Sequence, residues 1–207
     1  MEEYPAGSRL GVSTRLKILV IPGSVRAKSY NVRLAALAAK ELTLADAEVT
    51  RISLGDYPLP LYDADLAHES GPPENALRLK RLMSAHQGVF ITSPEYNASI
   101  TPILKNAIDW ISAAREHGEP ALAAYQNRVF AMAGASPGRS GARQSLLALR
   151  QILAVGCRAL VIADQVSVPH AEHAFDDRDK LRDTRAAGEL KTLVRKLVET
   201  ARLVAGK

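Results

Sequence analysis

Short apolar runs alternate with amphipathic stretches along most of this chain. The apolar runs are continuous and rich in β-branched residues, a pattern typical of strands that are buried on both faces of a parallel sheet. These predicted strands span residues 17–21, 49–54, 88–92, 129–133 and 159–163. Between and after them, apolar residues recur at helical spacing, which predicts helices over residues 30–42, 73–86, 102–115, 141–155 and 189–204.

The repeated strand–helix alternation predicts an α/β fold. Parallel strands need crossover helices, and right-handed crossovers leave few arrangements of one sheet with helices on both faces. Residues 1–15 mix proline, glycine, serine and charges without periodicity, so we expect a flexible N-terminal extension there and a single domain over 16–207. Sheets of this kind bind ligands at the carboxyl ends of their strands. The loops after the first, third and fourth strands are therefore expected to carry the chemistry.

The loop after the first strand has the composition of an anion site. Residues 23–31 read GSVRAKSYN, with polar or cationic side chains at Ser24, Arg26, Ser29 and Asn31. Ser29 is a candidate N-cap for the following helix, whose first backbone N–H groups, that of Tyr30 included, favour an anion. A phosphate monoester fits this donor set, and the alternative is a capped turn with a solvated arginine. The loop carries neither the G-x-x-x-x-G-K-[ST] nor the G-x-G-x-x-G pattern.

The loop after the third strand suits a flat ligand. Residues 92–102 read TSPEYNASITP, in which proline fixes a turn, asparagine tolerates unusual dihedral angles and tyrosine supplies a ring with a polar tip. Such a loop presents backbone groups to the edge of a planar heteroaromatic molecule, although Glu95 taken alone is also consistent with a surface carboxylate. For the helix that follows, structural roles are favoured at Lys105, Asn106, Asp109 and Trp110.

These two segments resemble the NAD(P)H-dependent FMN reductases with a flavodoxin-like fold. The family pattern is G-S-x-R-x-x-S-x-N after the first strand and P-E-Y-N-x-S followed by L-K-N-A-I-D-W after the third. Both stand here, from Gly23 to Asn31 and from Pro94 to Trp110, and the resemblance covers roughly residues 17–185. It implies a three-layer sandwich whose five-stranded parallel sheet has the order 2-1-3-4-5.

The resemblance also implies a binding site for FMN. The phosphate would be held by Ser24, Arg26, Ser29 and Asn31, to which the donor set above adds the backbone N–H of Tyr30, and the isoalloxazine ring would be lined by Pro94, Glu95, Tyr96 and Asn97. Residues 134–142 are similar to the family's third flavin loop, which implies flavin contacts at Ser136 and Gly138, although Ala142 replaces its second glycine. Backbone N–H groups of Asn97 and Ser136 are candidates to stabilise the reduced ring. Arg139 is either a contact for the phosphate of the nicotinamide cofactor or an exposed arginine without a role.

The activity implied is that of an FMN-dependent oxidoreductase. Hydride from NADPH or NADH would pass through bound FMN to a small-molecule acceptor such as a quinone, free flavin, metal oxyanion or azo compound, with no dedicated catalytic side chain. The alternative is a non-catalytic flavodoxin-like electron carrier or a flavin redox sensor. Carriers of this fold are usually strongly acidic, whereas this chain has a formal charge of +5. The family also implies a homodimer or homotetramer.

Composition and charge narrow the remaining classes. With 47% apolar and 24% charged residues the chain has a globular composition, and no apolar run approaches the roughly 18 residues of a membrane span. The acidic stretch at residues 1–5 lacks the apolar core of a secretory signal, so we expect a cytoplasmic protein without a membrane partner. The basic residues are scattered among acidic ones, which argues against a nucleic-acid partner and favours anionic small molecules.

Other reactive side chains give no second chemistry. His170 and His173 flank Glu172 without the H-E-x-x-H spacing or a third ligand motif, so no metal site is expected. Cys157 is the only cysteine, which excludes an internal disulfide, and its apolar neighbours indicate a packing role. The G-x-S-x-G pattern of serine hydrolases is missing.

Overall fold

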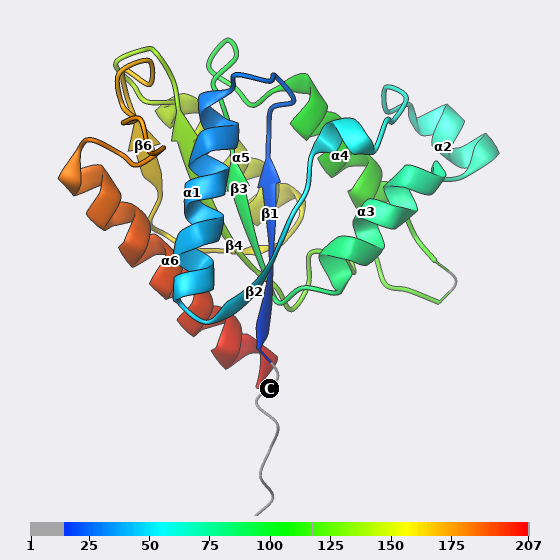
Figure 1. Ribbon diagram of the computed structural model, residues 1–207. Coiled ribbons are helices and arrows are strands. Elements are labelled where there is room, and N and C mark those ends of the chain that lie inside the picture. Colours follow the sequence, from blue (N-terminus) through cyan, green and yellow to red (C-terminus); the bar gives the residue numbers. More distant parts are fainter. Residues whose placement is uncertain (1–14, 117, 207) are drawn as a thin grey trace, which may run out of the picture.

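The computed structural model describes residues 15–116 and 118–206, so the predicted N-terminal extension lies outside the described residues except for Arg15. Strands and helices alternate along the chain (Figure 1). The strands are β1 (Leu16–Pro22), β2 (Ala47–Arg51), β3 (Gly88–Thr92), β4 (Val129–Ala135), β5 (Leu160–Val161) and β6 (Val166–Val168). The α-helices are α1 (Tyr30–Leu44), α2 (Ala64–Ser70), α3 (Glu74–Ser84), α4 (Pro102–Ala113), α5 (Arg143–Gln151) and α6 (Thr184–Ala205).

The sheet is parallel and has the order β2-β1-β3-β4-β5, which confirms the predicted order. A further strand, β6, was not predicted. β5 pairs with the start of β4, where Val129 faces Leu160, and β6 pairs with its end, where Ala135 faces Val168. The two short strands therefore share one edge of β4.

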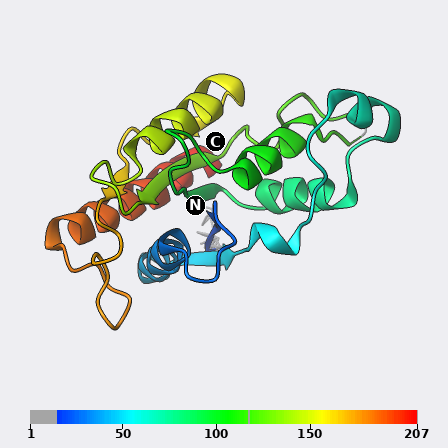
Figure 2. The same cartoon turned by 90° about the horizontal axis from the view of Figure 1, so that it is seen from above.

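Side chains of β1 alternate between two buried layers. Ile18 and Val20 pack with α1 and α6, whereas Leu19 and Ile21 pack with α3, α4 and α5. A strand that is apolar on both faces needs a helical layer on each side, and the view from above shows these layers (Figure 2). This arrangement confirms the predicted three-layer sandwich. The carboxyl ends of the strands lie at the upper edge of the sheet in Figure 1.

Several boundaries differ from the prediction. The second strand ends at Arg51 rather than residue 54, because Leu54 begins a 3₁₀ turn. α5 is regular only from Arg143 to Gln151 and continues as a π-helical turn over Ile152–Gly156. α6 begins at Thr184, ahead of the predicted residue 189, because Asp183 caps it by accepting a hydrogen bond from the backbone N–H of Arg185.

The unpredicted helix α2 belongs to a proline-rich excursion that is fastened to α4. The backbone carbonyl of Pro60 accepts hydrogen bonds from Asn106 Nδ2 (2.9 Å) and Trp110 Nε1 (2.8 Å). The Asn106 Oδ1 atom accepts a hydrogen bond from the backbone N–H of Tyr62 (2.7 Å), whose ring meets Trp110 edge-on. The roles predicted for Asn106 and Trp110 are therefore structural, as expected.

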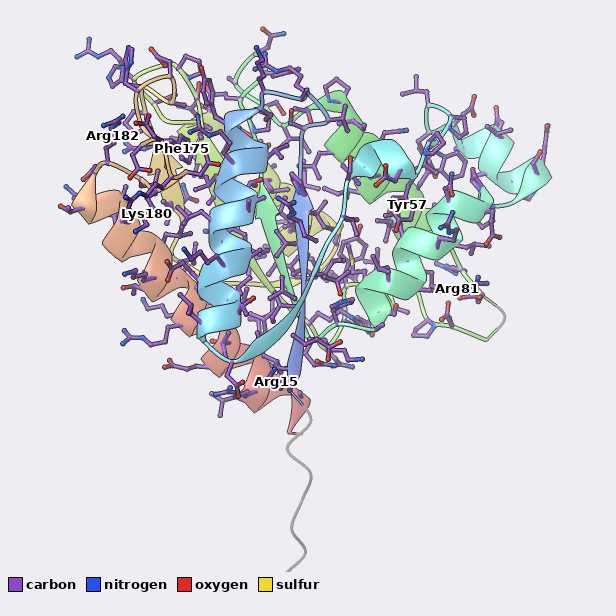
Figure 3. The ribbon with its side chains drawn as sticks, in the orientation of Figure 1. Arg15, Tyr57, Arg81, Phe175, Lys180 and Arg182 are labelled. Atoms are coloured by element: carbon purple, nitrogen blue, oxygen red, sulfur yellow. The ribbon has the colours of Figure 1, made fainter. Side chains whose placement is uncertain are left out.

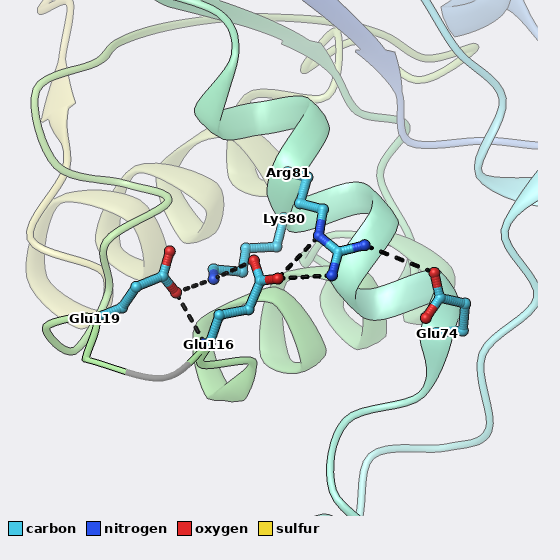
Figure 4. A network of polar contacts seen from close by, with 5 residues as sticks. All are labelled: Glu74, Lys80, Arg81, Glu116 and Glu119. Atoms are coloured by element: carbon cyan, nitrogen blue, oxygen red, sulfur yellow. Dashed lines mark hydrogen bonds and ion pairs between the residues drawn. The ribbon is translucent and has the colours of Figure 1, made fainter.

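A buried lysine ties α3 to the segment after α4 (Figure 4). Lys80 is 1% exposed, and its ammonium contacts the carboxylates of Glu116 (3.1 Å) and Glu119. Arg81 on the same helix pairs with Glu116 at 2.6 Å. Hydrogen bonds from Arg81 and then Lys80 lower the pKa of Glu116 to about 2. The network joins α3 to the segment that follows α4.

Cys157 lies in the core, as its neighbours predicted. The residue is 4% exposed, and burial raises the pKa of its thiol to about 11. The thiolate, which is the nucleophilic form, is therefore scarce at neutral pH.

Candidate flavin site

Three loops meet at the carboxyl edge of the sheet around a pocket of about 100 Å³. Nine of the eleven residues predicted from the sequence line it, namely Ser24, Arg26, Ser29, Tyr30, Asn31, Pro94, Glu95, Tyr96 and Ser136. Ala135 and Pro137 complete the lining. These two residues were not predicted, although their position on either side of Ser136 was a signal for them. The topology thus brings together segments more than 100 residues apart.

The first loop is held by its glycine. Backbone N–H of Gly23 donates to the carbonyl of Thr92 at the end of β3, and its carbonyl accepts from Thr101 Oγ1 (2.7 Å) at the N-cap of α4. A Cβ at this position would lie 2.9 Å from both Thr92 O and a methyl group of Leu104. Glycine is required because the loop passes this close to β3 and α4.

Many donors of this loop remain available to a ligand. Within the described residues, no hydrogen bond engages the backbone N–H groups of Ser24, Val25, Ala27, Lys28 and Tyr30. The hydroxyl oxygens of Ser24 and Ser29 accept bonds from backbone N–H groups within the loop and helix, which leaves their protons free to donate. Ser29 is the N-cap of α1, as predicted. Backbone donors, two hydroxyls, a helix N-terminus and the Arg26 guanidinium together fit a phosphate monoester.

Asn31 lines the pocket and also has a structural task. Its Nδ2 donates to the carbonyl of Ala135 (2.8 Å), and its Oδ1 accepts from the N–H of Ala135 (2.9 Å). Its own carbonyl accepts from Thr92 Oγ1 (2.8 Å). The side-chain amide therefore joins the end of β4 to α1, and the second N–H of its Nδ2 atom is left for a phosphate.

Glu95 connects the second loop to the third. Its carboxylate accepts hydrogen bonds from the backbone N–H of Gln144 (3.0 Å) and Ser145 (3.4 Å) in the first turn of α5. That helix has no capping side chain of its own, because Ala142 stands at its N-cap. A carboxylate also interacts favourably with the positive end of a helix. Glu95 thus caps α5 although it is distant from that helix in sequence. It is more than the surface carboxylate that its position in the sequence also allowed.

A second contact supports the same junction. The hydroxyl of Ser145 lies 2.8 Å from that of Ser93 and donates to the carbonyl of Pro94 (2.8 Å). Both serines are buried, with no exposed surface. The start of α5 and the beginning of the second loop are therefore fixed to each other on two sides.

Two predicted site residues lie outside the pocket. Tyr96 and Ser99 exchange two backbone hydrogen bonds, so Asn97 and Ala98 form a tight turn with φ angles of 50° and 60°. Asparagine accepts this left-handed geometry readily, but it leaves the Asn97 side chain exposed at the tip. Gly138 lies one residue beyond Pro137, and its N–H donates to Ser136 Oγ. Neither lines the pocket in this structure.

The third loop is shaped by β6. The backbone N–H of Ser136 donates to the carbonyl of Val168 (3.1 Å), so it is not available to stabilise a reduced ring, contrary to expectation. Gly141 has φ of 60°, and a Cβ there would lie 2.7 Å from the nitrogen of Pro169. Ala142 also adopts left-handed dihedral angles, φ 68° and ψ 20°. The chain therefore follows a glycine-like path although the second glycine is an alanine, at a local cost of about 1 kcal/mol.

The segment after β6 is anchored to the outer side of α1. The Arg33 guanidinium lies 4.5 Å from the centre of the Phe175 ring, and its Nε is 2.7 Å from an Asp179 carboxylate oxygen. Figure 3 shows Phe175 beside the first turns of α1, with Lys180 and Arg182 further out. The segment thereby supports the helix whose first turn lines the pocket.

Comparisons with known proteins agree with this geometry. The family model described as NADPH-dependent FMN reductase matches residues 16–173. An NAD(P)H-dependent FMN reductase of Pseudomonas aeruginosa is 32% identical over 176 residues, which are 84% of this chain and 89% of that protein. A quinone reductase of Pseudomonas putida is 32% identical over 166 residues, which are 80% of this chain and 84% of that protein. Among solved structures, FerB from Paracoccus denitrificans, a flavoenzyme NAD(P)H:(acceptor) oxidoreductase, superposes on this chain with a TM-score of 0.69. The two are 29% identical, and the superposition covers 91% of this chain and 98% of FerB.

The chain belongs to the NADPH-dependent FMN reductase family. It is accordingly an NAD(P)H-dependent oxidoreductase that uses FMN, with the flavodoxin-like fold. Between residues 15 and 206, position 117 aside, no helix has the length and apolarity needed to cross a membrane. In the same part of the chain, no group of three metal-ligating side chains comes together.

Proposed function

We propose that the pocket between the three loops binds FMN and that a quinone is the main electron acceptor. The phosphate would be held by the donors of the first loop, and the ring would lie against Pro94, Glu95, Tyr96 and the third loop near Ser136. The observation that carries the assignment is that Ser24 and Tyr30, whose backbone N–H groups are unengaged, and Arg26 line the same pocket as the residues of the second loop. FMN, when bound, supplies the hydride-accepting ring and the means to pass electrons on.

The protein's own groups would bind and orient. Arg26 and the N-terminus of α1 provide the positive charge for the phosphate, while Asn31 and Glu95 keep the three loops in register. Tyr96 is 45% exposed at the rim, where its ring is available to a second substrate. We assign no acid or base to a side chain, because the hydride chemistry belongs to the flavin.

The quinone assignment rests on the relatives and on the accessible rim. The Pseudomonas putida relative is named for quinone reduction, and planar acceptors suit a pocket that opens beside a tyrosine ring. Free flavin, metal oxyanions and azo compounds are further acceptors that such an open site would admit. Either NADPH or NADH would serve as donor.

We further propose that residues 16–207 act as one domain, located in the cytoplasm, and that the chain assembles as a homodimer or homotetramer. Support for assembly comes from large apolar side chains exposed on α5, the π-helical turn after it and β5. These are Leu147, Val155 and Leu160, which are 52%, 74% and 50% exposed. Apolar surface of this kind is commonly covered by a protein partner.

Steady-state turnover tests the proposed function. The chain loaded with FMN should oxidise NADPH when 1,4-benzoquinone is supplied under anaerobic conditions, and hydroquinone should accumulate in equal amount. NADPH oxidation that requires a second protein as acceptor would contradict the proposal and favour an electron carrier. Light scattering of the same sample gives the oligomeric state.

A further inference from the structure

A hollow of about 350 Å³ lies beside the phosphate end of the candidate flavin site. This first-loop groove is bounded by the loop after β1, the end of β2 and the 3₁₀ turn over Leu54–Asp56. The loop and the turn are neighbours in both ribbon views (Figures 1 and 2), and a Cβ at Gly55 would lie 3.4 Å from a methyl group of Val25. The volume of the groove is within the range of sites that bind small molecules, about 300–1,000 Å³.

The groove shares two residues with the flavin pocket. Ser24 and Arg26 line both, whereas Arg51, at the end of β2, lines only the groove. Ser24 is 5% exposed, and its hydroxyl, which accepts a hydrogen bond from the backbone N–H of Arg26, keeps a proton to donate. A phosphate that is held by Ser24 and Arg26 would therefore border on the groove.

The charges of the groove favour an anion. Arg26 and Arg51 are exposed, and neither side chain makes a hydrogen bond or an ion pair with any residue that the structure describes. Among the described lining residues Asp56 alone is acidic, and its carboxylate has no partner there either. The guanidinium groups of two arginines are therefore available to a ligand, against the single negative charge of one aspartate. Guanidinium groups are preferred partners of phosphate, because they present paired donors to its oxygens.

The remaining lining suits an adenosine. Val25, Val32 and Ile52 provide apolar surface for a flat base, and Val25 is 49% exposed although its side chain is apolar. The carboxylate of Asp56 can accept a hydrogen bond from the amino group of adenine. The hydroxyl of Ser53 accepts from the backbone N–H of Gly55 and keeps its own proton for a ribose oxygen. Apolar contact with a few polar groups is the usual composition of a small-molecule site.

We propose that the first-loop groove binds the adenylate half of FAD, so that the flavin site accepts this dinucleotide as well as FMN. The phosphate next to the flavin would take the position proposed for the phosphate of FMN. The second phosphate would bind Arg26 and Arg51, and the adenine would pack on Val25. Arg51 is then the residue that distinguishes FAD from FMN. The inference rests on the proposed function for the position of the first phosphate.

Calorimetric titration of the flavin-free chain with FMN and with FAD tests the groove without turnover. In Arg51→Ala the Kd for FAD should rise about tenfold at low ionic strength, since a charge-assisted bond to phosphate contributes about that factor. The Kd for FMN should stay unchanged, because Arg51 does not line the flavin pocket. Lys28→Ala is the matched control and should keep both values, because Lys28 is exposed on the same loop but lines neither the groove nor the flavin pocket. A parent chain that binds FMN but not FAD, or a ratio of the two Kd values that Arg51→Ala leaves unchanged, would overturn the proposal.

Competition with ADP and with inorganic pyrophosphate separates a nucleotide site from a site for anions alone. ADP carries the adenosine that pyrophosphate lacks, so it should displace FAD from the parent chain at a lower concentration. Equal competition by the two probes would show that the groove recognises only anions and would overturn the proposal. A parent chain that binds neither flavin would contradict the proposed function, and a direct titration with ADP then decides the groove. Binding of ADP that Arg51→Ala weakens would support the groove, and failure to bind ADP would overturn it.

Discussion

The side chain of Asn31, at the start of α1, holds Ala135, at the end of β4, through a donor and an acceptor at once. The two residues are 104 positions apart, and the pair is buried. Since the carbonyl of Asn31 also accepts from Thr92 at the end of β3, one residue joins the three segments that form the pocket. The shape of the candidate flavin site is thus built into the packing of the sheet edge rather than left to the loops alone.

Replacing Asn31 should therefore damage both stability and FMN binding. Asn31→Ala leaves the N–H and the carbonyl of Ala135 without their partner. Each buried backbone group without a hydrogen bond lowers the free energy of unfolding by about 1–3 kcal/mol. Urea unfolding measures the loss in the free energy of unfolding. Asn31→Asp keeps an acceptor for the N–H but offers no donor to the carbonyl, so it should not restore the parent stability. A change below about 0.5 kcal/mol in Asn31→Ala, the range of ordinary surface substitutions, would contradict this account.

Glu95 provides the second test of the junction. Glu95→Ala removes the cap of α5 and should lower the free energy of unfolding by about 1 kcal/mol, as loss of a capping group does elsewhere. Glu95→Gln keeps an acceptor for Gln144 but loses the charge at the helix N-terminus, so its loss should be smaller. Thermal unfolding of the parent, Glu95→Gln and Glu95→Ala gives the order of their stabilities. Equal stability of Glu95→Ala and the parent would show that the carboxylate does not cap the helix.

Arg26 is expected to act on FMN affinity and not on folding. It is exposed, and it lines the pocket, so Arg26→Ala should weaken FMN binding by about 10- to 150-fold, the value of a charge-assisted hydrogen bond. Lys28→Ala is the matched control, because Lys28 is exposed on the same loop but does not line the pocket. Fluorescence titration of FMN measures both. Similar affinities in the two variants would refute the assignment of Arg26 to the phosphate.

The ion pairs of Glu116 with Lys80 and Arg81 predict how the free energy of unfolding depends on pH. Its carboxyl has a pKa of about 2 in the folded chain against an ordinary value of 4.5. The folded chain therefore takes up this proton less readily than the unfolded one. The stabilisation is fully present above about pH 4.5 and is lost as the pH falls toward about 2.

Glu116→Gln removes the titrating group and keeps an acceptor for Arg81, so the fall in unfolding free energy between these pH values should become shallower. Glu69→Gln is the control, because Glu69 is exposed on α2 and has no ion pair with any residue that the structure describes. Urea unfolding at several pH values follows both variants. An identical slope in Glu116→Gln and the parent would show that Arg81 and Lys80 do not hold this carboxylate.

Much of the fold could be predicted because its strands are buried on both sides. The continuous apolar runs of β1, β3 and β4 have few other interpretations, and parallel pairing follows from the helices between them. The elements that were missed are short. β6 has three residues and α2 buries none, so neither produces a periodic signal. The capping residues Asp63 and Asp183 were signals that would have placed the starts of α2 and α6.

The site shows where sequence motifs stop being informative. The residue types of the loops indicate an anion and a flat ring, and the structure places most of them around one pocket. The motif does not say which side chain faces a ligand and which one holds the protein together. Asn31 and Glu95 line the pocket and also hold the protein together, which the motif does not show because their partners Ala135 and Gln144 are distant in sequence. Asn97 lies outside the pocket lining because the left-handed turn that it forms leaves its side chain exposed.

Reduction by NADPH of FMN bound between the three loops is the property that most needs a direct test. An anaerobic titration of the FMN-loaded protein with NADPH, followed by the absorbance of oxidised flavin, tests it most directly. We expect rapid bleaching that is complete near equimolar NADPH, with the flavin retained by the protein after gel filtration. Failure to retain FMN, or bound FMN that stays oxidised with excess NADPH, would contradict it.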